Sequence, residues 1–266
     1  MEKTLGVIGG GNMGGAILRG MVSNWLTAPE AVIVAEPLED RRRMLSRWHV
    51  ATTTDAREAA RCGRVLLAVK PQVMGEVLAT IAPVVSDDAL LVSIAAGCTT
   101  AFIHKALGGK GRLVRVMPNT PLLVGAGMSA ICAGPRATPE DMQWVQQVFG
   151  SFGQTCVVDE SAMDAVTAVS GSGPAYFFYL VEAMTAAGVA EGLDEPTAEL
   201  LARATCAGAG KLLATSKDSP AQLRQNVTSP GGTTAAAIAA MDAAGVREAL
   251  VAAVRAAAAR SRELGR

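Results

Sequence analysis

Hydrophobic residues in the first part of the chain form short continuous runs separated by longer amphipathic stretches. The runs are rich in β-branched residues and have the length of buried strands: 5–9, 32–35, 65–69, 90–94, 113–116, 128–132 and 155–158. Between them, apolar positions recur at helical spacing over 12–23, 38–48, 71–82, 99–107 and 139–149. Continuous apolar strands that alternate with helices predict a parallel sheet covered on both faces.

The pattern changes after residue 160, where the strand-like runs end. Helical spacing, with many alanines, continues over 164–192, 196–215 and 235–266. We therefore expect an α/β fold with two domains. Residues 1–158 would form the α/β domain and residues 159–266 an all-helical domain.

Composition narrows the class of partners. The chain has 24 basic and 24 acidic side chains and only 4% aromatic residues, which gives no reason to expect nucleic acid or an anionic membrane as a partner. No apolar run is long enough to span a membrane, and the first residues have no pattern of a signal or transit peptide. The hydrophobic content of 50% favours self-association.

Cysteine and histidine usage indicates the compartment and argues against a metal site. The 5 cysteines are widely spaced in apolar contexts, as expected for reduced core residues of a cytoplasmic protein. The 2 histidines have no cysteine or carboxylate at ligand spacing. We expect no metal.

A glycine-rich turn follows the first predicted strand. Gly9, Gly11 and Gly14 have the spacing G-x-G-x-x-G, and a helix is expected to begin directly after Gly11. Such glycines permit a tight turn, close approach of a pyrophosphate and close packing of helix on strand, while the helix N-terminus offers free N–H groups. The sequence therefore predicts a Rossmann-type dinucleotide-binding domain.

Glu36 ends the second predicted strand, roughly 20 residues beyond the last glycine, where a carboxylate binds the ribose in this type of domain. It would accept a hydrogen bond from the 2′-hydroxyl of NAD and repel the 2′-phosphate of NADP. Arg41, Arg42 and Arg43 could offset that repulsion, or could simply form a solvated helix face. Preference between NADPH and NADH stays open.

Three further segments end at the same predicted edge of the sheet. Lys70 closes the third long strand, the small residues 93–97 close the next, and Asn119 lies in a proline-bounded turn beyond another. Lys70 could contact a cofactor or be a solvated strand end. Asn119 could bind a nicotinamide amide or hold its own turn.

Small residues interrupt the helical half twice. The first interruption, 170–174 (SGSGP), predicts a kink or a close backbone approach. Hydroxyacid dehydrogenases of the 6-phosphogluconate type resemble this layout but carry a catalytic lysine four residues after the last glycine, where this chain has Phe177. That difference disfavours alcohol oxidation and fits a substrate that needs no strong protein base, such as an imine.

The second interruption is 229–234 (SPGGTT). Ser229 suits a helix N-cap and Pro230 the first helical position, so plain capping is one interpretation. The two glycines add nothing to helix stability but clear side chains from the N–H groups of Gly231 to Thr234. The alternative is a bare helix N-terminus flanked by hydroxyls, which would bind a carboxylate.

Taken together, GVIGGGNMG, LLAVKPQ, SIAAG, VMPNTP, AVSGSGPAY and NVTSPGGTT resemble, in this order and over nearly the whole chain, the pyrroline-5-carboxylate reductases. The resemblance implies an N-terminal dinucleotide-binding domain and a C-terminal helical dimerisation domain, with dimers that assemble further into decamers. It also implies the reduction of 1-pyrroline-5-carboxylate to L-proline, in the cytoplasm, with NADPH or NADH.

The resemblance assigns roles to individual positions. Cofactor contacts are implied for Asn12, Met13, Val69, Lys70, Ala96 and Asn226. The substrate carboxylate would be held at Ser229, Gly232, Thr233 and Thr234, and Glu160, which sequence alone suggests is an exposed cap, matches a ligand-contacting position.

Two departures from the family pattern are visible: Glu36, where many members have a small hydroxylated residue, and Gln225, where an acidic residue is common. Rival interpretations are a reductase of a related cyclic imine acid and a non-catalytic nucleotide-sensing homologue.

Overall fold

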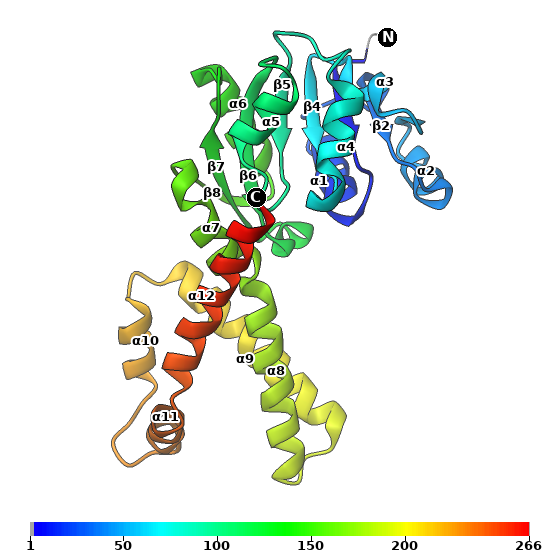
Figure 1. The fold of residues 1–266 in the computed structure, drawn as a ribbon. Coiled ribbons are helices and arrows are strands. Elements are labelled where there is room, and N and C mark those ends of the chain that lie inside the picture. Colours follow the sequence, from blue (N-terminus) through cyan, green and yellow to red (C-terminus); the bar gives the residue numbers. More distant parts are fainter. Residues whose placement is uncertain (1–2, 266) are drawn as a thin grey trace. The chain divides into compact units, whose positions relative to one another are not determined.

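The computed structural model describes residues 3–265, which form two compact units (Figure 1). The first unit comprises the chain up to Gly171 together with the stretch from Ala257 onward, and the second comprises Ser172–Ala256. By contacts alone, residues 159–171 belong with the first unit, although the predicted boundary assigns them to the helical domain. The domain boundary between residues 158 and 159 stays a prediction.

The first unit is built on an eight-stranded sheet in the order β3-β2-β1-β4-β5-β6-β7-β8. Its strands are β1 (Leu5–Ile8), β2 (Val32–Ala35), β3 (Ala51–Thr53), β4 (Arg64–Leu67), β5 (Leu90–Ser93), β6 (Arg112–Pro118), β7 (Gly127–Ala133) and β8 (Gly153–Val157). The sheet is parallel from β3 to β6, as predicted. The prediction of a parallel sheet is wrong at β7, which runs antiparallel to β6.

Helices cover both faces of the sheet, as the alternation of strands and helices predicts. They are α1 (Asn12–Ser23), α2 (Glu39–Ser46), α3 (Ala56–Ala60), α4 (Pro71–Ile81), α5 (Thr100–Ala106), α6 (Pro139–Gly150) and the short α7 (Met163–Val166). Two elements, β3 and α3, have no counterpart in the sequence prediction. The other strands and the five long helices lie where the pattern places them.

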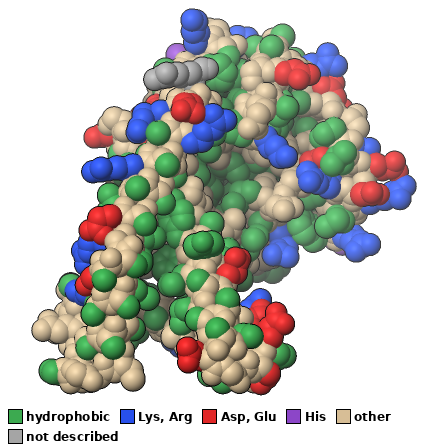
Figure 2. Space-filling model, turned by 60° about the horizontal axis from the view of Figure 1, so that its bottom comes forward, with side chains coloured by type: hydrophobic (Ala, Val, Ile, Leu, Met, Phe, Trp, Pro, Cys, Tyr) green, Lys and Arg blue, Asp and Glu red, His purple; other side chains and the backbone are tan. Residues whose placement is uncertain are grey.

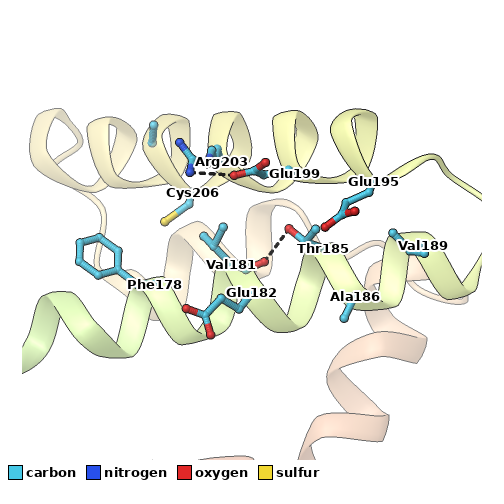
Figure 3. Close-up of a pocket in the computed structure, with 11 residues that line it drawn as sticks. Phe178, Val181, Glu182, Thr185, Ala186, Val189, Glu195, Glu199, Arg203 and Cys206 are labelled. Atoms are coloured by element: carbon cyan, nitrogen blue, oxygen red, sulfur yellow. Dashed lines mark hydrogen bonds and ion pairs between the residues drawn. The ribbon is translucent and has the colours of Figure 1, made fainter.

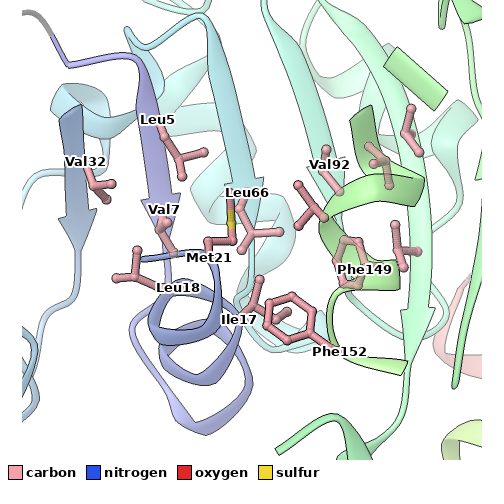
Figure 4. Packing of buried hydrophobic residues seen from close by; sticks show 14 of the residues in the cluster. Leu5, Val7, Ile17, Leu18, Met21, Val32, Leu66, Val92, Phe149 and Phe152 are labelled. Atoms are coloured by element: carbon pink, nitrogen blue, oxygen red, sulfur yellow. The ribbon is translucent and has the colours of Figure 1, made fainter. Parts of the chain in front are cut away.

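Two separate hydrophobic clusters lie on the two faces of the sheet. On one face, Ile17, Leu18 and Met21 of α1 pack with Leu5 and Val7 of β1, as Figure 4 shows. This cluster also takes in α2 and α6, whereas α3, α4 and α5 belong to the cluster on the other face. Since alternate strand residues point to opposite faces, nearly every strand position is apolar, and this explains the continuous hydrophobic runs.

A capping box starts α6. The Thr138 hydroxyl accepts the N–H of Asp141, and the Asp141 carboxylate accepts the N–H of Thr138. The same carboxylate receives two bonds from the guanidinium of Arg112 on β6, at 2.7 Å from Nε and 3.1 Å from Nη2. One carboxylate thus joins a helix start to a sheet strand.

The second unit is helical. It contains α8 (Gly173–Ala190), α9 (Glu195–Thr215), α10 (Pro220–Asn226), α11 (Thr233–Ala243) and the first part of α12 (Val246–Leu264). Helices α8 and α9 lie side by side in Figure 1 and are joined by a short turn. The predicted all-helical character of this region is confirmed. Among residues 3–265, no helix combines the length and the apolar character needed to cross a membrane.

The end of α12 packs within the first unit. The Ser261 hydroxyl is buried and donates a hydrogen bond to the Asp164 carboxylate at 2.6 Å. Further along, a methyl group added at Gly97 would lie 2.9 Å from the Cβ atom of Leu264. The stretch from Ala257 therefore completes a unit whose other residues lie far earlier in the chain.

Candidate active site

The glycine loop lies between β1 and α1, at the carboxyl edge of the sheet. Gly9 has φ +102°, and a methyl group there would lie 2.6 Å from the Ala68 carbonyl oxygen. At Gly14 a methyl group would lie 2.2 Å from the Gly9 carbonyl oxygen. These two glycines therefore allow α1 to begin directly against the sheet, as expected for a dinucleotide-binding loop.

The N-terminus of α1 is open to a ligand. Gly11 is its N-cap and contributes no side chain, and Asn12 and Met13 are its first two residues. A methyl group at Gly11 would have the Nη1 atom of Arg41 as its nearest neighbour, at 3.4 Å. A cavity of about 400 Å³ lies beside this loop and is also lined by Arg19. Bare N–H groups, the helix dipole and two guanidinium groups fit the diphosphate of a dinucleotide.

Glu36 follows β2 and is buried, with 4% of its side chain exposed. Its Oε2 atom accepts a hydrogen bond from the N–H of Gly10 at 2.9 Å, and its Oε1 atom accepts one from the N–H of Leu38 at 3.0 Å. The carboxylate is thereby held against the glycine loop, at the position where a ribose-binding acid is expected.

The three arginines after Glu36 each have a partner in the structure. Arg41 Nη1 lies 4.0 Å from the Glu36 carboxylate, and Arg42 donates to the carbonyl oxygens of Glu36 and Pro37 at 2.8 and 2.6 Å. Arg43 forms an ion pair with Glu39 one turn earlier on α2. Of the three arginines, only Arg41 has its guanidinium close to the Glu36 carboxylate, as is needed to offset the negative charge.

Two further candidate segments reach the same edge of the sheet, because β4 runs parallel beside β1 and β5 runs parallel beside β4. Val69 is half-buried just beyond β4, and Lys70 is exposed as the N-cap of α4. Ala96 lies in the loop after β5 and is partly exposed. The fold thus brings Val69, Lys70 and Ala96 to the edge that carries the glycine loop and Glu36.

Asn119, beyond β6, uses both ends of its side-chain amide within the first unit. The oxygen accepts the N–H of Met128 at 2.9 Å, and the nitrogen donates to the Ser170 hydroxyl at 3.4 Å. It also caps the 3₁₀ turn Thr120–Val124. These bonds favour the interpretation that Asn119 holds its turn.

Glu160 does not lie in the environment that sequence alone suggests. Its side chain is 29% exposed and bonds to residues far away in sequence, so the expectation of an exposed cap is wrong. The carboxylate receives the guanidinium of Arg115 on β6 at 3.0 Å and both the N–H and the hydroxyl of Thr100, the first residue of α5. Glu160 therefore joins α5 to β6.

Arg115 is a charged residue that the motifs in the sequence do not single out. It is 2% exposed in the middle of β6, and its Nη2 atom is buried without a hydrogen-bond partner. A charged residue in the apolar run 113–116 was the available signal, since buried charges need partners. The sequence alone did not indicate that the partner is Glu160.

The turn 229–232 precedes α11, and the structure corrects its predicted cap. The N-cap is Gly232 and the helix begins at Thr233, so the assignment of Ser229 as N-cap and Pro230 as first helical residue is wrong. Gly231 has φ +72°, and the N–H of Gly232 donates to the carbonyl oxygen of Ser229 at 3.0 Å. The chain makes a turn here before the helix starts.

The corrected geometry keeps a bare helix N-terminus. Gly232 contributes no capping side chain, and the N–H groups of Thr233 and Thr234 lie in the first turn, which has no intrahelical acceptors for them. A methyl group at Gly232 would lie 2.5 Å from the Ser229 hydroxyl oxygen, so that hydroxyl lies next to the N-cap. Of the four N–H groups named in the prediction, that of Gly232 is bonded to Ser229, and those of Thr233 and Thr234 lie in the first turn of α11; the carboxylate receptor stays a prediction.

Asn226 ends α10, in the same unit as this turn. Its side chain is exposed, accepts a hydrogen bond from Gln222 at 2.7 Å and donates to Asp218 at 3.3 Å. The candidate residues are thus divided between the units. Glu160, Asn119 and the glycine-loop group lie in the first unit, while Asn226 and residues 229–234 lie in the second.

The interruption at 170–174 is a π-helical turn, Thr167–Gly171, between α7 and α8. A methyl group at Gly171 would lie 2.5 Å from the Cε atom of the Met117 side chain, and one at Gly173 would meet no atom within 4 Å, so the interruption is an irregular helical turn rather than a close approach of two backbones. Phe177 is 55% exposed on the first turns of α8. Turns of this kind are frequent at functional sites.

The cysteines are free thiols, and three of them are buried: Cys62, Cys98 and Cys132. Burial raises the pKa of all three, in the case of Cys132 to about 11. Within residues 3–265, no group of histidine, cysteine and acidic side chains could hold a metal ion.

Comparison with known proteins places these features in one family. Residues 160–264 match the family model "Pyrroline-5-carboxylate reductase dimerisation", and residues 4–97 match "NADP oxidoreductase coenzyme F420-dependent". A curated pyrroline-5-carboxylate reductase of Synechocystis sp. is 43% identical over 268 residues, covering 100% of both chains. The chain belongs to the pyrroline-5-carboxylate reductase family.

Solved structures of pyrroline-5-carboxylate reductases share the whole fold. The enzyme of Coxiella burnetii has a TM-score of 0.90 at 36% identity and covers 100% of both chains. The pyrroline carboxylate reductase of Plasmodium falciparum, solved with NADP bound, has a TM-score of 0.89 at 31% identity and covers 99% of this chain and 98% of its own. The family recognised from sequence motifs is confirmed, and so is its nicotinamide-dependent oxidoreductase class.

The dimerisation region of the family corresponds to the helical unit and its flanks, and it supports self-association. A groove of about 1070 Å³ between α8 and α9 is lined by Phe178, Val181 and Val189, with Glu199 and Arg203 paired at 2.7 Å (Figure 3). Apolar side chains also lie exposed on the surface shown in Figure 2. Such exposure is typical of a surface that another subunit covers.

Proposed function

We propose that this chain reduces 1-pyrroline-5-carboxylate to L-proline, the last step of proline biosynthesis, with NADPH or NADH as hydride donor. The observation that carries the proposal is the end-to-end match, at 43% identity, to a curated pyrroline-5-carboxylate reductase. The glycine loop, Glu36 and the open N-terminus of α11 are the local features that support it.

The chemistry needs little from protein side chains. The nicotinamide ring of the cofactor supplies a hydride from C4. The acceptor is C5 of the protonated cyclic imine, and as the new C–H bond forms, the π electron pair of the C=N bond moves onto nitrogen. The product is a neutral secondary amine, so no side chain has to take up or release a proton during the transfer. Phe177, at the place of a lysine in related dehydrogenases, is consistent with such a reaction.

Positioning is then the contribution of the chain, and it can lower the barrier by several kcal/mol, about 7–11 kcal/mol in favourable cases. We assign the substrate carboxylate to the N-terminus of α11. The Thr233 and Thr234 N–H groups, the bare N-cap Gly232 and the hydroxyls of Ser229 and Thr234 supply donors there without a formal cation.

The cofactor is assigned to the carboxyl edge of the sheet in the first unit. Gly9, Gly11 and Gly14 would shape the loop under the diphosphate, with Asn12 and Met13 at the helix start. Val69, Lys70 and Ala96 would line the neighbouring strand ends, and Asn226, at the end of α10, is kept as a cofactor-binding candidate. Asn119 is kept as a cofactor candidate, although its amide is already engaged in the turn.

Glu160 is assigned a positioning role. Both oxygens of its carboxylate bond to Thr100, which directly follows the loop that contains Ala96. Arg115 also bonds to this carboxylate, at the Oε1 atom that accepts the N–H of Thr100. Through Thr100, Glu160 would fix the loop against which the cofactor lies.

The quaternary state and the location are proposed on the basis of the same family assignment. We propose dimers formed through the helical unit, assembled further into decamers, and a cytoplasmic location. The exposed apolar residues of α8 and α9 support the assembly, and the buried free thiols support a reducing compartment. Light scattering on the purified protein measures the assembly, and a monomeric mass would contradict it.

The decisive test is oxidation of NADH and NADPH in the presence of 1-pyrroline-5-carboxylate. We expect turnover above a control without the imine, with L-proline as the product. Absence of turnover with both cofactors would refute the function. Faster turnover of the six-membered imine homologue, in direct competition, would instead assign the chain to a related cyclic imine reductase. Cofactor binding without any turnover would indicate a nucleotide-sensing protein.

A further inference from the structure

The corner between β2 and α2 lies beside the glycine loop and is rich in charged side chains. It carries the acids Glu36, Glu39 and Asp40, followed by three arginines. The only acid of the three that is buried is Glu36, which lies directly beside the glycine loop. The hydrogen bonds and ion pairs of these side chains determine which charge the corner presents to a cofactor.

We infer that Glu36 makes this enzyme select NADH over NADPH. The inference rests on the proposed function, since it assumes that a nicotinamide cofactor is the hydride donor. A carboxylate has about four acceptor positions, and the N–H groups of Gly10 and Leu38 use one on each oxygen. Each oxygen keeps capacity for one more donor, which suits the adjacent 2′- and 3′-hydroxyls of an adenosine ribose.

The carboxylate is also fixed before any cofactor arrives. Its two backbone bonds join it to both the glycine loop and the start of α2, and 4% of the side chain is exposed. A preorganised acceptor loses little conformational freedom when it binds a hydroxyl. It cannot turn away from a 2′-phosphate without breaking both bonds.

The arginines do not convert the corner into a phosphate site. Arg42 is bonded to two backbone carbonyl oxygens, and Arg43 is paired with Glu39. Arg41 is the nearest of the three to the Glu36 carboxylate, and its guanidinium also lies 3.4 Å from the position of a methyl group at Gly11. Gly11 caps α1, where the diphosphate of either cofactor would lie, so Arg41 serves NADH and NADPH alike.

The test compares both cofactors in binding and in turnover. We expect the wild-type protein to bind NAD⁺ about 10- to 100-fold more tightly than NADP⁺ by isothermal titration calorimetry, the range expected for one charge-assisted hydrogen bond. The ratio of kcat/KM for NADH over NADPH should lie in the same range. Glu36→Ser should bring both ratios close to one, whereas Glu36→Asp, which keeps the charge, should retain the preference for NADH.

Glu39→Gln is the matched control. It removes one negative charge from the same corner but from an exposed side chain, and it should leave both ratios within about twofold of wild type because exposed charges are well screened. A wild-type preference for NADPH, or ratios that Glu36→Ser leaves unchanged, would overturn the inference. If Glu36→Ser does not fold, Glu36→Gln provides the uncharged variant of equal size.

Failure of the proposed function gives a different result. In that case neither cofactor supports imine reduction, yet calorimetry still reports tighter binding of NAD⁺ than of NADP⁺. Turnover with NADPH as the preferred donor has the opposite meaning, since it would support the function and refute the role of Glu36.

Discussion

Gly14 and Gly15 are neighbours in α1, yet the structure predicts opposite effects when each is replaced by alanine. At Gly14 the new methyl group would lie 2.2 Å from the Gly9 carbonyl oxygen and 2.9 Å from the Cβ atom of Ala68. At Gly15 its nearest neighbours would be the Gly10 carbonyl oxygen at 3.5 Å and a methyl carbon of Leu45 at 3.8 Å. The second pair of distances is ordinary van der Waals contact.

The magnitudes follow from these contacts. Alanine inside a helix is favoured over glycine by about 0.5–1 kcal/mol, and both variants gain this amount. Gly14→Ala must also push α1 away from a backbone oxygen, for which overpacking costs of about 1–3 kcal/mol are usual and the upper end applies. We therefore expect Gly15→Ala to be stabilised by about 0.5–1 kcal/mol and Gly14→Ala to be destabilised by about 1–2 kcal/mol.

Thermal unfolding followed by circular dichroism measures the difference. At about 2–4 °C per kcal/mol for a unit of this size, Gly14→Ala should lower Tm by about 2–8 °C and Gly15→Ala should raise it by about 1–4 °C. Because the displaced helix starts at the glycine loop, Gly14→Ala should also weaken NADH binding. A Gly14→Ala protein with the Tm and the NADH affinity of wild type would refute the tight contact of Gly14 with Gly9 and Ala68.

Three further outcomes test other parts of the structure. Thr234→Ala should raise KM for the imine substrate about tenfold and leave KM for the cofactor nearly unchanged, the loss expected for one hydrogen bond to a carboxylate; equal changes in both would contradict the assigned receptor. Burial raises the pKa of Asp141, but hydrogen bonds from Arg112 and Thr138 outweigh it and hold the pKa below its usual value. The ionised Asp141 therefore stabilises the folded state fully above pH 3.8, and this contribution is lost as the pH falls through the lower pKa of the folded state. Acid unfolding of Asp141→Asn should lack this loss of stability. If the variant and the wild type lose stability equally as the pH falls, the assigned role of Asp141 is wrong. Cys132, with its pKa near 11, should resist alkylation by iodoacetamide at pH 8 until urea unfolds the chain. Mass spectrometry measures the labelling, and a labelled Cys132 in the native protein would contradict the prediction.

Much of the first unit is predictable because its strands are buried on both faces and its helices are strongly amphipathic. β3 and α3 escape prediction since three and five residues are too few to establish a period. The reversal of β7 also leaves no trace in composition, because a buried strand is apolar whichever way it runs. These features depend on pairing with other strands.

The site residues show the same division. The glycine loop and Glu36 could be located because each follows a strand at a fixed distance. The bond between Glu160 and Arg115 could not, since it joins residues 45 apart in sequence and depends on how the 3₁₀ turn Glu160–Ala162 packs against β6. The cap of α11 was misassigned because Ser-Pro fits a helix start locally, whereas a left-handed Gly231 turns the chain before the helix begins.

The return of α12 to the first unit has a consequence for the order in which the protein folds during synthesis. All eight strands leave the ribosome before the helical unit is made, but the bond between Ser261 and Asp164 and the contact of Leu264 with Gly97 form only after α12 has emerged. The first unit therefore cannot complete its packing until the whole second unit has been synthesised. A ribosome stalled within α9 should hold a first unit that is more easily cleaved by protease than the released protein.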